Sequence, residues 1–223
     1  MKKSDIKILV GCECSDAVRG NFEKLGFNAV SCDILPNENP NAKHIQGDLL
    51  ETIQNYNWDV IICFPPCTDL AVSGAAWFSE KRKTGQQQKS INFFLKIASA
   101  NCNYIAIENP VGIMSNIYKK PTQIIQPYYF GDTFQKTTCL WLKNLPKLIH
   151  YKQRDLFNNT ITHVSKGDFI TYKGKTKSKW YSDAYNLPKR ERAKIRSRTF
   201  PGIAEAMAKQ WGEYLEQKFL INQ

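Results

Sequence analysis

Short apolar runs alternate with amphipathic segments along the first half of the chain. The apolar runs are of strand length, and the segments between them carry apolar residues at helical spacing. The pattern predicts strands at 6–10, 28–32, 44–46, 58–63 and 104–107. It predicts helices from Ser15 or Asp16 to Leu25, at 49–55 and at 86–99. This alternation is typical of an α/β fold, here Rossmann-like and doubly wound with a mostly parallel sheet.

The alternation weakens after Pro110. One further strand-like run is found at 138–142, and a last helix is expected at 202–220. The apolar face of that helix consists of Ala204, Met207, Ala208, Trp211 and Leu215. Residues 147–195 are polar, basic and aromatic without a clear period, which indicates a small lobe or loop system. We therefore expect a main domain at 1–146, completed by the helix at 200–220, and a small basic lobe at 147–199.

Positive charge is concentrated in the expected lobe. The 223 residues carry a net charge of +11, which favours a polyanionic partner, most often nucleic acid. Between Ser165 and Arg198, eleven Lys and Arg residues stand against three acidic ones, with aromatic residues interleaved. Phosphate contacts and base stacking would use such a mixture. The expected contacts from the lobe are Lys179, Trp180, Arg196 and Arg198. A merely basic surface is the alternative.

Membrane and metal signals are weak. No run approaches the roughly 18 apolar residues of a membrane span, and the N-terminal apolar run is too short for a signal peptide. A cytoplasmic protein is therefore expected. The seven cysteines are scattered, which argues against a disulfide framework. The spacing of Cys12, Cys14, Cys63 and Cys67 matches no standard zinc pattern, so no metal is expected, although a thiol redox or metal protein using these four remains an alternative.

A thiol and a carboxyl group follow two of the predicted strands. Cys67 comes after Phe64-Pro65-Pro66, in which two prolines fix the backbone, and Glu108-Asn109 follow the run at 104–107. In a parallel sheet ligands bind beyond the carboxyl ends of the strands, so both groups should meet there. A position at the start of a helical turn would lower the pKa of Cys67. Semi-burial would keep Glu108 protonated, and Pro110 should turn the chain after Asn109.

The same edge carries the features of a nucleoside site. Gly11 to Ser15 follow the first strand, Asp33 the second and Asp48 the third. An acid after the second strand often holds a ribose hydroxyl, which suggests an adenosine-type ligand at Asp33. Asp48 is well placed to meet the adenine. Each acid alone is more often a helix cap or a solvated turn, but their order favours a nucleoside cofactor.

In these motifs the chain resembles the cytosine-C5 DNA methyltransferases, and most closely the short versions found in bacteriophages and prophages. Phe64-Pro65-Pro66-Cys67 resembles the proline-cysteine nucleophile motif of that family. Glu108-Asn109-Pro110 resembles its Glu-Asn-Val motif, with proline in place of valine. Asp33, Gly47-Asp48 and the helix at 202–206 resemble the family's elements in the same order.

Two elements depart from the family pattern. Gln135-Lys136 resembles a Gln-x-Arg element found late in the sequences of that family, with lysine where arginine is expected. The loop at 11–15 holds one glycine where the family is rich in glycine and phenylalanine.

The resemblance implies transfer of a methyl group from S-adenosylmethionine to C5 of cytosine in DNA, through a covalent adduct of Cys67. The implied catalytic residues are Cys67, Glu108, Asn109 and Lys136. The implied cofactor contacts are Gly11, Cys12, Glu13, Ser15, Asp33, Ile34, Asp48 and Pro65. The implied nucleic-acid contacts outside the lobe are Pro66, Thr68, Ser73, Lys81 and Arg82. The main domain would then bind cofactor and catalyse, and the lobe would recognise the target.

Residues 68–85 are interpreted as a mobile loop that closes over a flipped-out base, with Lys81, Arg82 and Lys83 facing phosphates. Two other functions remain open. One is a non-catalytic nucleic-acid-binding protein on the same scaffold, which the single-glycine loop favours. The other is a related enzyme acting on cytosine in RNA or in a free nucleotide, which the short target region favours.

Overall fold

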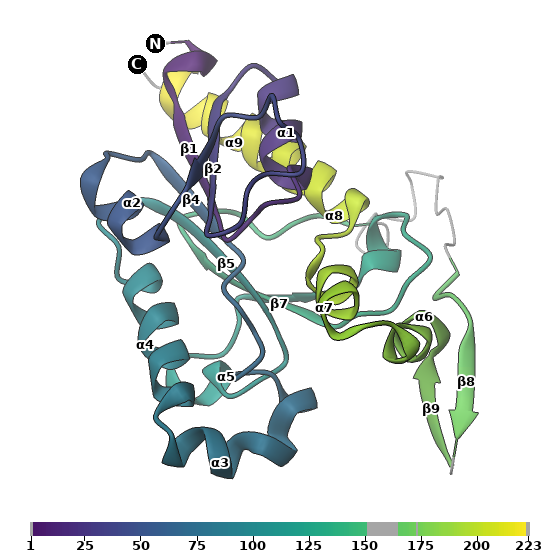
Figure 1. Cartoon of the computed structure of the whole chain (residues 1–223). Helices are drawn as coiled ribbons and strands as arrows, with labels where there is room; N and C mark the ends of the chain where they lie inside the picture. The colour runs from purple at the N-terminus through teal and green to yellow at the C-terminus, as the bar shows by residue number, and fades with distance from the viewer. Residues whose placement is uncertain (1, 151–164, 173, 222–223) are drawn as a thin grey trace.

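A twisted seven-stranded sheet organises the computed structural model, which describes residues 2–150, 165–172 and 174–221 (Figure 1). The strand order is β3-β2-β1-β4-β5-β7-β6. The strands are β1 (Lys7–Gly11), β2 (Asn28–Asp33), β3 (His44–Gln46), β4 (Val60–Cys63), β5 (Tyr104–Pro110), β6 (Gln123–Ile125) and β7 (Thr138–Lys143). The first five strands are parallel, whereas β7 is antiparallel to both β5 and β6. The predicted α/β, Rossmann-like and mostly parallel fold is confirmed.

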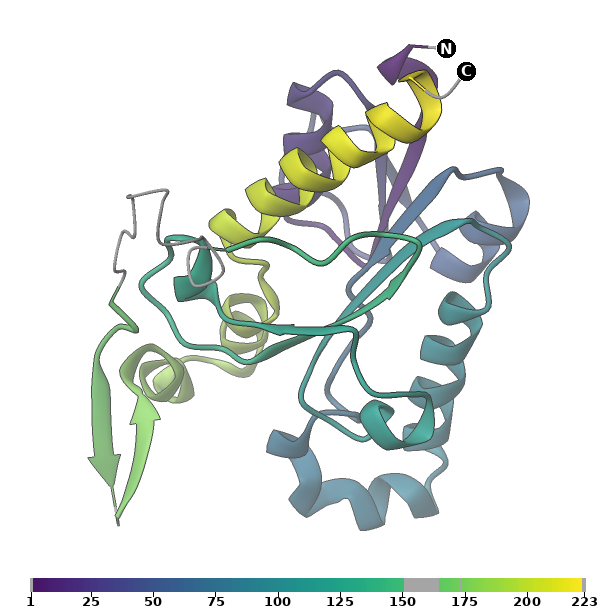
Figure 2. The same ribbon diagram turned by 180° about the vertical axis from the view of Figure 1, so that it is seen from behind.

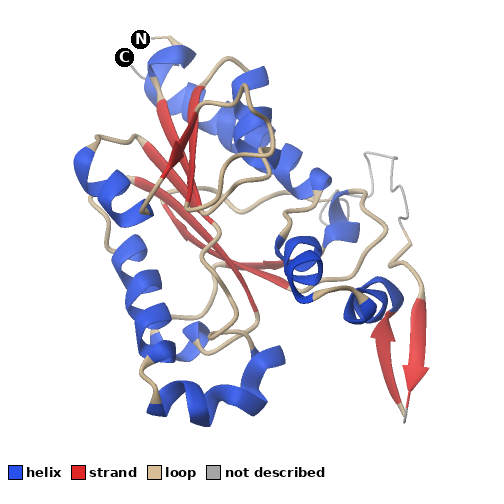
Figure 3. Cartoon of the chain, in the orientation of Figure 1, coloured by secondary structure: helices blue, strands red, loops and turns tan. Residues whose placement is uncertain are grey.

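Helices cover both faces of this sheet (Figure 3). Alternate strand residues point to opposite faces, and the two faces belong to two separate apolar clusters. One face packs against α1 (Ala17–Lys24) and the C-terminal helix, and the other against α2 (Leu49–Asn55) and α4 (Gln86–Ala98). Burial on both faces explains why the strands are continuous apolar runs.

The order of the strands changes direction in the sheet at the boundary between β1 and β4. From β1 it builds outward to β2 and β3, then returns to β4 on the other side of β1 and continues to β5. Gly11 of β1 pairs with Cys32 of β2 and with Cys63 of β4, so these strands end level with one another. The loops after them therefore meet at one edge, where open α/β sheets bind ligands.

The C-terminal helix confirms the predicted apolar face. It comprises α8 (Pro201–Ala206), a π-helical stretch at Met207–Trp211, α9 (Gly212–Glu216) and a second π-helical stretch at Gln217–Ile221. Figure 2 shows it lying along the sheet beside the N-terminal segment. The predicted face is buried, and the indole Nε1 of Trp211 donates to the Pro146 carbonyl at 2.9 Å. Among the described residues no helix is long and apolar enough to cross a membrane.

Three local predictions were wrong. Strand β5 continues to Pro110 instead of turning after Asn109, because β7 supplies partners for its last residues: Asn109 faces Cys139 and Pro110 faces Thr138. Helix α1 begins at Ala17 without a side-chain cap from Asp16. The segment 68–85 is largely helical, with a 3-10 helix, η2 (Val72–Trp77), and α3 (Phe78–Lys83), and is not a loop.

The basic lobe has structure that its sequence does not reveal. A hairpin of β8 (Phe169–Tyr172) and β9 (Lys175–Ser178) leads into α6 (Lys179–Asp183), a short 3-10 turn and α7 (Lys189–Ser197). Three further elements, α5 (Met114–Ile117), β6 and a 3-10 turn at Pro127–Phe130, were also missed. Residues 151–164 and 173 of the predicted lobe lie outside the described residues. The domain boundaries stay a prediction.

Replacing Trp211 by alanine tests the packing of the C-terminal helix. The side chain is fully buried, so Trp211→Ala should lower the free energy of unfolding by about 3–5 kcal/mol in a denaturant titration. The exposed neighbour Lys209 provides the control, and Lys209→Ala should change stability by less than about 0.5 kcal/mol. Equal effects of the two changes would mean that the helix does not complete the core.

Candidate active site

Strand register brings the predicted thiol and carboxyl groups together. Cys63 at the end of β4 pairs with Ile107 of β5. Cys67 therefore follows β4 at the edge where Glu108 extends β5. The side-chain amide Nδ2 of the buried Asn109 donates to the Pro65 carbonyl at 2.8 Å, which joins the two motifs directly.

The turn that carries Cys67 is held from several sides. The carbonyl oxygen of Cys67 accepts hydrogen bonds from the amides of Leu70 and Ala71, at 3.0 and 2.9 Å. The next residues pair with the chain beyond β5, since the Val72 amide donates to the Val111 carbonyl at 3.0 Å. Gly112 makes this approach possible, because a Cβ atom there would lie 2.2 Å from the Leu70 carbonyl oxygen. The thiol is therefore presented by a rigid turn.

Burial raises the pKa of the Cys67 thiol, and the neighbouring Glu108 raises it further, while Lys136 and Arg196 lower it in part. The expectation of a lowered pKa at Cys67 is therefore wrong. Burial also raises the pKa of Glu108, against the opposing effect of Lys136, and this direction favours the protonated carboxyl group. The arrangement is a half-buried thiol beside a carboxyl group of raised pKa, with Lys136 and Arg196 near the thiol.

The two cations come from distant parts of the chain. Lys136 precedes β7, and its Nζ lies 5.8 Å from the centre of the Phe200 ring. Arg196 extends from α7 and stacks over Tyr181 of α6, with 4.2 Å between the guanidinium carbon and the ring centre. Its guanidinium also donates to the Tyr181 hydroxyl, and Ser73 of η2 hydrogen-bonds to the same tyrosine. The lobe is thus connected to the segment that follows Cys67.

Glu13 caps α1, a role assigned to Ser15 or Asp16 from the sequence. Its carboxylate oxygens accept from the amides of Val18 and Arg19 at 2.7 and 3.0 Å, and its side chain is buried. Asp16 instead forms an ion pair with Arg19. Both oxygens of Glu13 are therefore engaged within the protein, and its predicted contact with a cofactor stays a prediction that this geometry does not favour.

The first loop is tightly packed and strained. A Cβ atom at Gly11 would lie 2.6 Å from Leu49 Cδ1 and 2.8 Å from Cys63 Sγ, so a larger residue at the end of β1 would have to displace these side chains. Cys12 has φ of 57°, a left-handed conformation that disfavours a side chain. The Cys12 amide donates to the Cys32 carbonyl at 2.7 Å, which holds this conformation in place.

The two predicted nucleoside acids each use one carboxylate oxygen locally. Oδ1 of Asp33 accepts from the Leu35 amide at 2.9 Å, and Oδ1 of Asp48 accepts from the Leu50 amide at 2.7 Å as the cap of α2. Within the described residues their second oxygens make no hydrogen bond. Both acids raise the pKa of Cys12, after burial, which places them around the end of β1. Ile34 is 76% exposed beside Asp33, and Ser15 is half-buried.

The remaining predicted nucleic-acid contacts differ in availability. Pro66, Thr68, Ser73 and Arg82 are exposed, and the first two flank Cys67 in the sequence. Lys81 is instead paired with Asp69 at 2.9 Å.

In the lobe, Lys179 pairs with Asp183 at 2.8 Å, and Arg198 with Glu38 of the loop after β2 at 3.0 Å. Trp180 is half-buried against Phe134 and Phe200. The Lys179 pair is local, at i,i+4 spacing. The contacts of Arg198 and Trp180 join residues far apart in the sequence, so no local sequence pattern predicts them.

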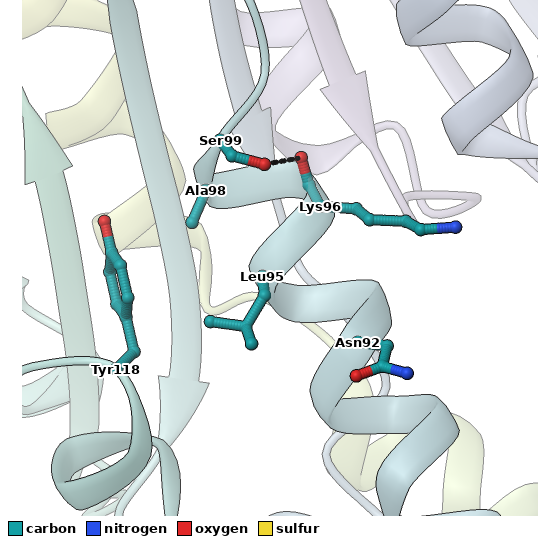
Figure 4. Close-up of a pocket in the computed structure, with 6 residues that line it drawn as sticks. All are labelled: Asn92, Leu95, Lys96, Ala98, Ser99 and Tyr118. Carbon is teal, nitrogen blue, oxygen red and sulfur yellow. Dashed lines mark hydrogen bonds between the residues drawn. The ribbon is translucent and has the colours of Figure 1, made fainter.

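A separate hollow of about 530 Å³ is lined by the C-terminal half of α4, Ser99 and Tyr118 (Figure 4). Its lining residues are Asn92, Leu95, Lys96, Ala98, Ser99 and Tyr118. None of them is a predicted site residue. The seven cysteines are all free thiols, and the described residues contain no group of three or more His, Cys, Asp or Glu side chains that could hold a metal ion.

Comparisons with known proteins add little to this geometry. No family model matches the chain, and no curated protein matches it. Among solved structures it is similar to a presumed DNA modification methyltransferase encoded within a prophage of E. coli, with 16% identity and a TM-score of 0.41. That match covers 82% of this chain and 56% of the other, so the chain spans little more than half of that protein. At this score the likeness bears on neither activity nor substrate.

Burial of Glu13 predicts a pH-dependent stability. Burial raises its pKa to about 7, although the amides of Val18 and Arg19 lower it in part. An unfolded glutamate ionises near pH 4.3, so the folded protein binds the extra proton between about pH 4 and 7 and loses stability as the pH rises through that range. Glu13→Gln cannot titrate there. In urea titrations from pH 5 to 7, the stability of the wild type should fall relative to that of this variant, whereas parallel curves would contradict the assignment.

Proposed function

We propose that the protein transfers a methyl group from S-adenosylmethionine to C5 of cytosine in DNA through a covalent adduct of Cys67. The observation that carries the proposal is the meeting of Cys67 and Glu108 at the carboxyl edge of the sheet, with Asn109 joining the two motifs. A thiol beside a carboxyl group whose raised pKa favours the protonated form suits addition to a pyrimidine ring, because one group attacks carbon while the other donates to a ring nitrogen.

Some of the predicted cofactor residues fit a nucleoside. The second oxygens of Asp33 and Asp48 are acceptors for hydroxyl and amine donors, and the exposed Ile34 offers an apolar surface to a flat ring. Gly11 lets the end of β1 pack closely against Leu49 and Cys63, beside these acids. We assign cofactor binding to these residues with Ser15, Cys12 and Pro65, and assign Glu13 to the support of the loop. When bound, S-adenosylmethionine supplies the electrophilic methyl group that C5 takes.

Cys67 loses its proton to solvent and adds to C6 of the base. The sulfur lone pair forms the S–C6 bond, the electrons of the C5=C6 bond form a C4=C5 bond, and the electrons of the C4=N3 bond move onto N3. C5 is then part of an enamine and is nucleophilic; when it takes the methyl group, the N3 lone pair restores C4=N3 and the proton on N3 returns to Glu108. After C5 is methylated, its proton leaves to solvent water. The electron pair of that C–H bond restores C5=C6, the S–C6 bond breaks and Cys67 is released. Covalent attack thus divides one difficult step into easier ones.

Glu108 and its neighbours stabilise the charge that develops on the ring. The protonated carboxyl group donates toward N3, the position that gains electrons during thiol addition. Asn109 positions this group by binding the Pro65 carbonyl, and its Oδ1 is buried with no partner among the described residues, an unmet acceptor of the kind found at functional sites. Lys136 and Arg196 favour the thiolate form of Cys67.

The lobe supplies the basic surface for the nucleic acid. Lys179, Trp180, Arg196 and Arg198 all lie on or next to α6 and α7, and α7 brings Arg196 to the thiol. The other predicted contacts, Pro66, Thr68, Ser73 and Arg82, belong to the segment that follows β4, and Ser73 hydrogen-bonds to Tyr181 of the lobe. A base flipped out of a duplex would reach Cys67 where these two groups of residues meet.

A non-catalytic binding protein is the second candidate. Cys12 holds a left-handed conformation where glycine would be unstrained, which favours a cofactor loop that has lost its function. Such a protein would bind DNA without binding S-adenosylmethionine, and a titration calorimetry experiment with the cofactor alone separates the two functions.

Replacing Cys67 by alanine tests the reaction directly. Genomic DNA from cells expressing the wild type should contain new 5-methylcytosine after digestion to nucleosides and mass spectrometry. DNA from cells expressing Cys67→Ala should contain no new 5-methylcytosine, because the nucleophile is missing. Cys139→Ala provides the control, since Cys139 is a buried thiol of β7, and it should retain methylation if the protein folds. Full activity of Cys67→Ala would contradict the covalent mechanism, and absence of methylation with the wild type would favour RNA, a free nucleotide or binding alone.

Replacing Lys136 by methionine tests the ionisation of Cys67. Burial and Glu108 raise the pKa of this thiol, so activity should increase with pH as the thiolate forms. Loss of Lys136 removes a cation that lowers this pKa, so the acid limb of the pH–rate profile should move to higher pH. The rate below the pKa should fall about tenfold for each unit of that shift. An unshifted profile with weaker DNA binding would instead identify Lys136 as a phosphate contact.

A further inference from the structure

Lys81 lies among exposed cations but is itself engaged within the protein. Its Nζ donates to the Thr68 carbonyl at 2.7 Å and pairs with Asp69 Oδ1 at 2.9 Å, and its side chain is only 15% exposed. Its neighbours Arg82 and Lys83 on α3 are exposed. Lys81 therefore contacts the two residues that directly follow Cys67, which does not favour its predicted role as a phosphate contact.

Asp69 also accepts hydrogen bonds from two side chains of α4. Its Oδ2 accepts from the Ser90 hydroxyl at 2.8 Å, and its carbonyl accepts from the buried Gln87 side chain at 2.9 Å. Burial would raise the pKa of Asp69, but the hydrogen bonds from Lys81 and Ser90 outweigh it and the pKa lies below its ordinary value. Asp69 is thus an ionised, buried carboxylate that joins α3, α4 and the Cys67 turn.

Stability alone is a poor reason for such an arrangement. Burying an ion pair costs desolvation that its mutual attraction barely offsets, and apolar residues of similar volume are often as stable. The pair instead fixes geometry, because four polar contacts hold the residues immediately after the candidate nucleophile, and two of them reach the backbone carbonyls of Thr68 and Asp69. A displacement of about 1 Å at a reacting group can reduce a rate roughly 100-fold.

We propose that Lys81 and Asp69 are positioning residues that hold the Cys67 turn in its reactive geometry. This inference rests on the proposed function, since it assigns the pair to the same thiol. Lys81 acts through the Thr68 carbonyl and the Asp69 carboxylate and touches neither the base nor the DNA backbone. The hydrogen bonds from Ser90 and Gln87 anchor the pair to α4, which packs on the sheet.

Steady-state kinetics of Lys81→Met on the full chain test the inference. Loss of the ammonium group should reduce kcat by roughly 100-fold with little change in the KM for DNA. Lys81→Arg should restore part of kcat, because a guanidinium can still reach both oxygens. Lys89→Met removes the same charge from an exposed residue of α4 and should match the wild type. A higher KM with unchanged kcat and a weaker salt dependence would overturn the inference and make Lys81 a phosphate contact.

A second readout does not depend on methyl transfer. The alkylation rate of Cys67 by iodoacetamide, measured by peptide mass spectrometry, should rise severalfold in Lys81→Met as the turn opens, and should be unchanged in Lys89→Met. Should the wild type show no methylation, the proposed function fails, and the alkylation rates still decide whether Lys81 positions the thiol. Equal alkylation of wild type and Lys81→Met overturns the inference. If Lys81→Met does not fold, Ser90→Ala removes a single hydrogen bond to Asp69 and is measured in both assays.

Discussion

The pairing of β4 with β5 is the constraint on which the candidate site depends. Parallel strands in register end level with each other, so the residues after Cys63 and Ile107 must occupy the same edge of the sheet. Antiparallel pairing with β7 then extends β5 to Pro110 and holds Glu108 in a strand beside the Cys67 turn. The hydrogen bond from Asn109 to the Pro65 carbonyl fixes the separation of the two segments. A thiol and a carboxyl group are thereby held by backbone hydrogen bonds and not by flexible loops.

Burial at this edge sets the chemistry that the two groups can perform. It raises the pKa of both Cys67 and Glu108, which suits a carboxyl group that donates a hydrogen bond but opposes formation of the thiolate. Lys136 and Arg196 lower the pKa of Cys67 and so offset part of the effect of burial on the thiol. The two residues come from different parts of the chain. Because Arg196 belongs to the basic lobe and stacks on Tyr181, the electrostatics of the thiol depend on how the lobe is placed. Nucleic-acid binding and thiol ionisation are therefore physically connected in the proposed mechanism.

The carboxyl edge of the sheet has two halves, one around the Cys67 turn after β4 and one at the ends of β1, β2 and β3. The polar side chains of the two halves differ in whether they are bound within the protein. Around the Cys67 turn, Lys81, Asp69 and Ser90 bind one another and the backbone. At the half proposed to bind the cofactor, Glu13 caps α1, while Asp33 and Asp48 each keep one carboxylate oxygen without a partner among the described residues. Rigid support and available acceptors are what a site that orients two reactants requires. The strained Cys12 is the feature that fits this interpretation least well.

The sequence by itself determined the strands β1 to β5, the helices α1, α2 and α4, and the buried face of the C-terminal helix, because the period of apolar residues is a local property of the chain. Cys67 and Glu108 could be placed at one edge for the same reason. The sequence did not predict the helical segment at 72–83. The tertiary structure alone decided the extension of β5 to Pro110, the cap of α1 by Glu13, the pairing of Lys81 with Asp69 and the approach of Arg196 to the thiol. Each of these except the Glu13 cap depends on a partner far away in the sequence. A lysine in an exposed cluster and a lysine buried against a carboxylate have the same local pattern, and only packing distinguishes them.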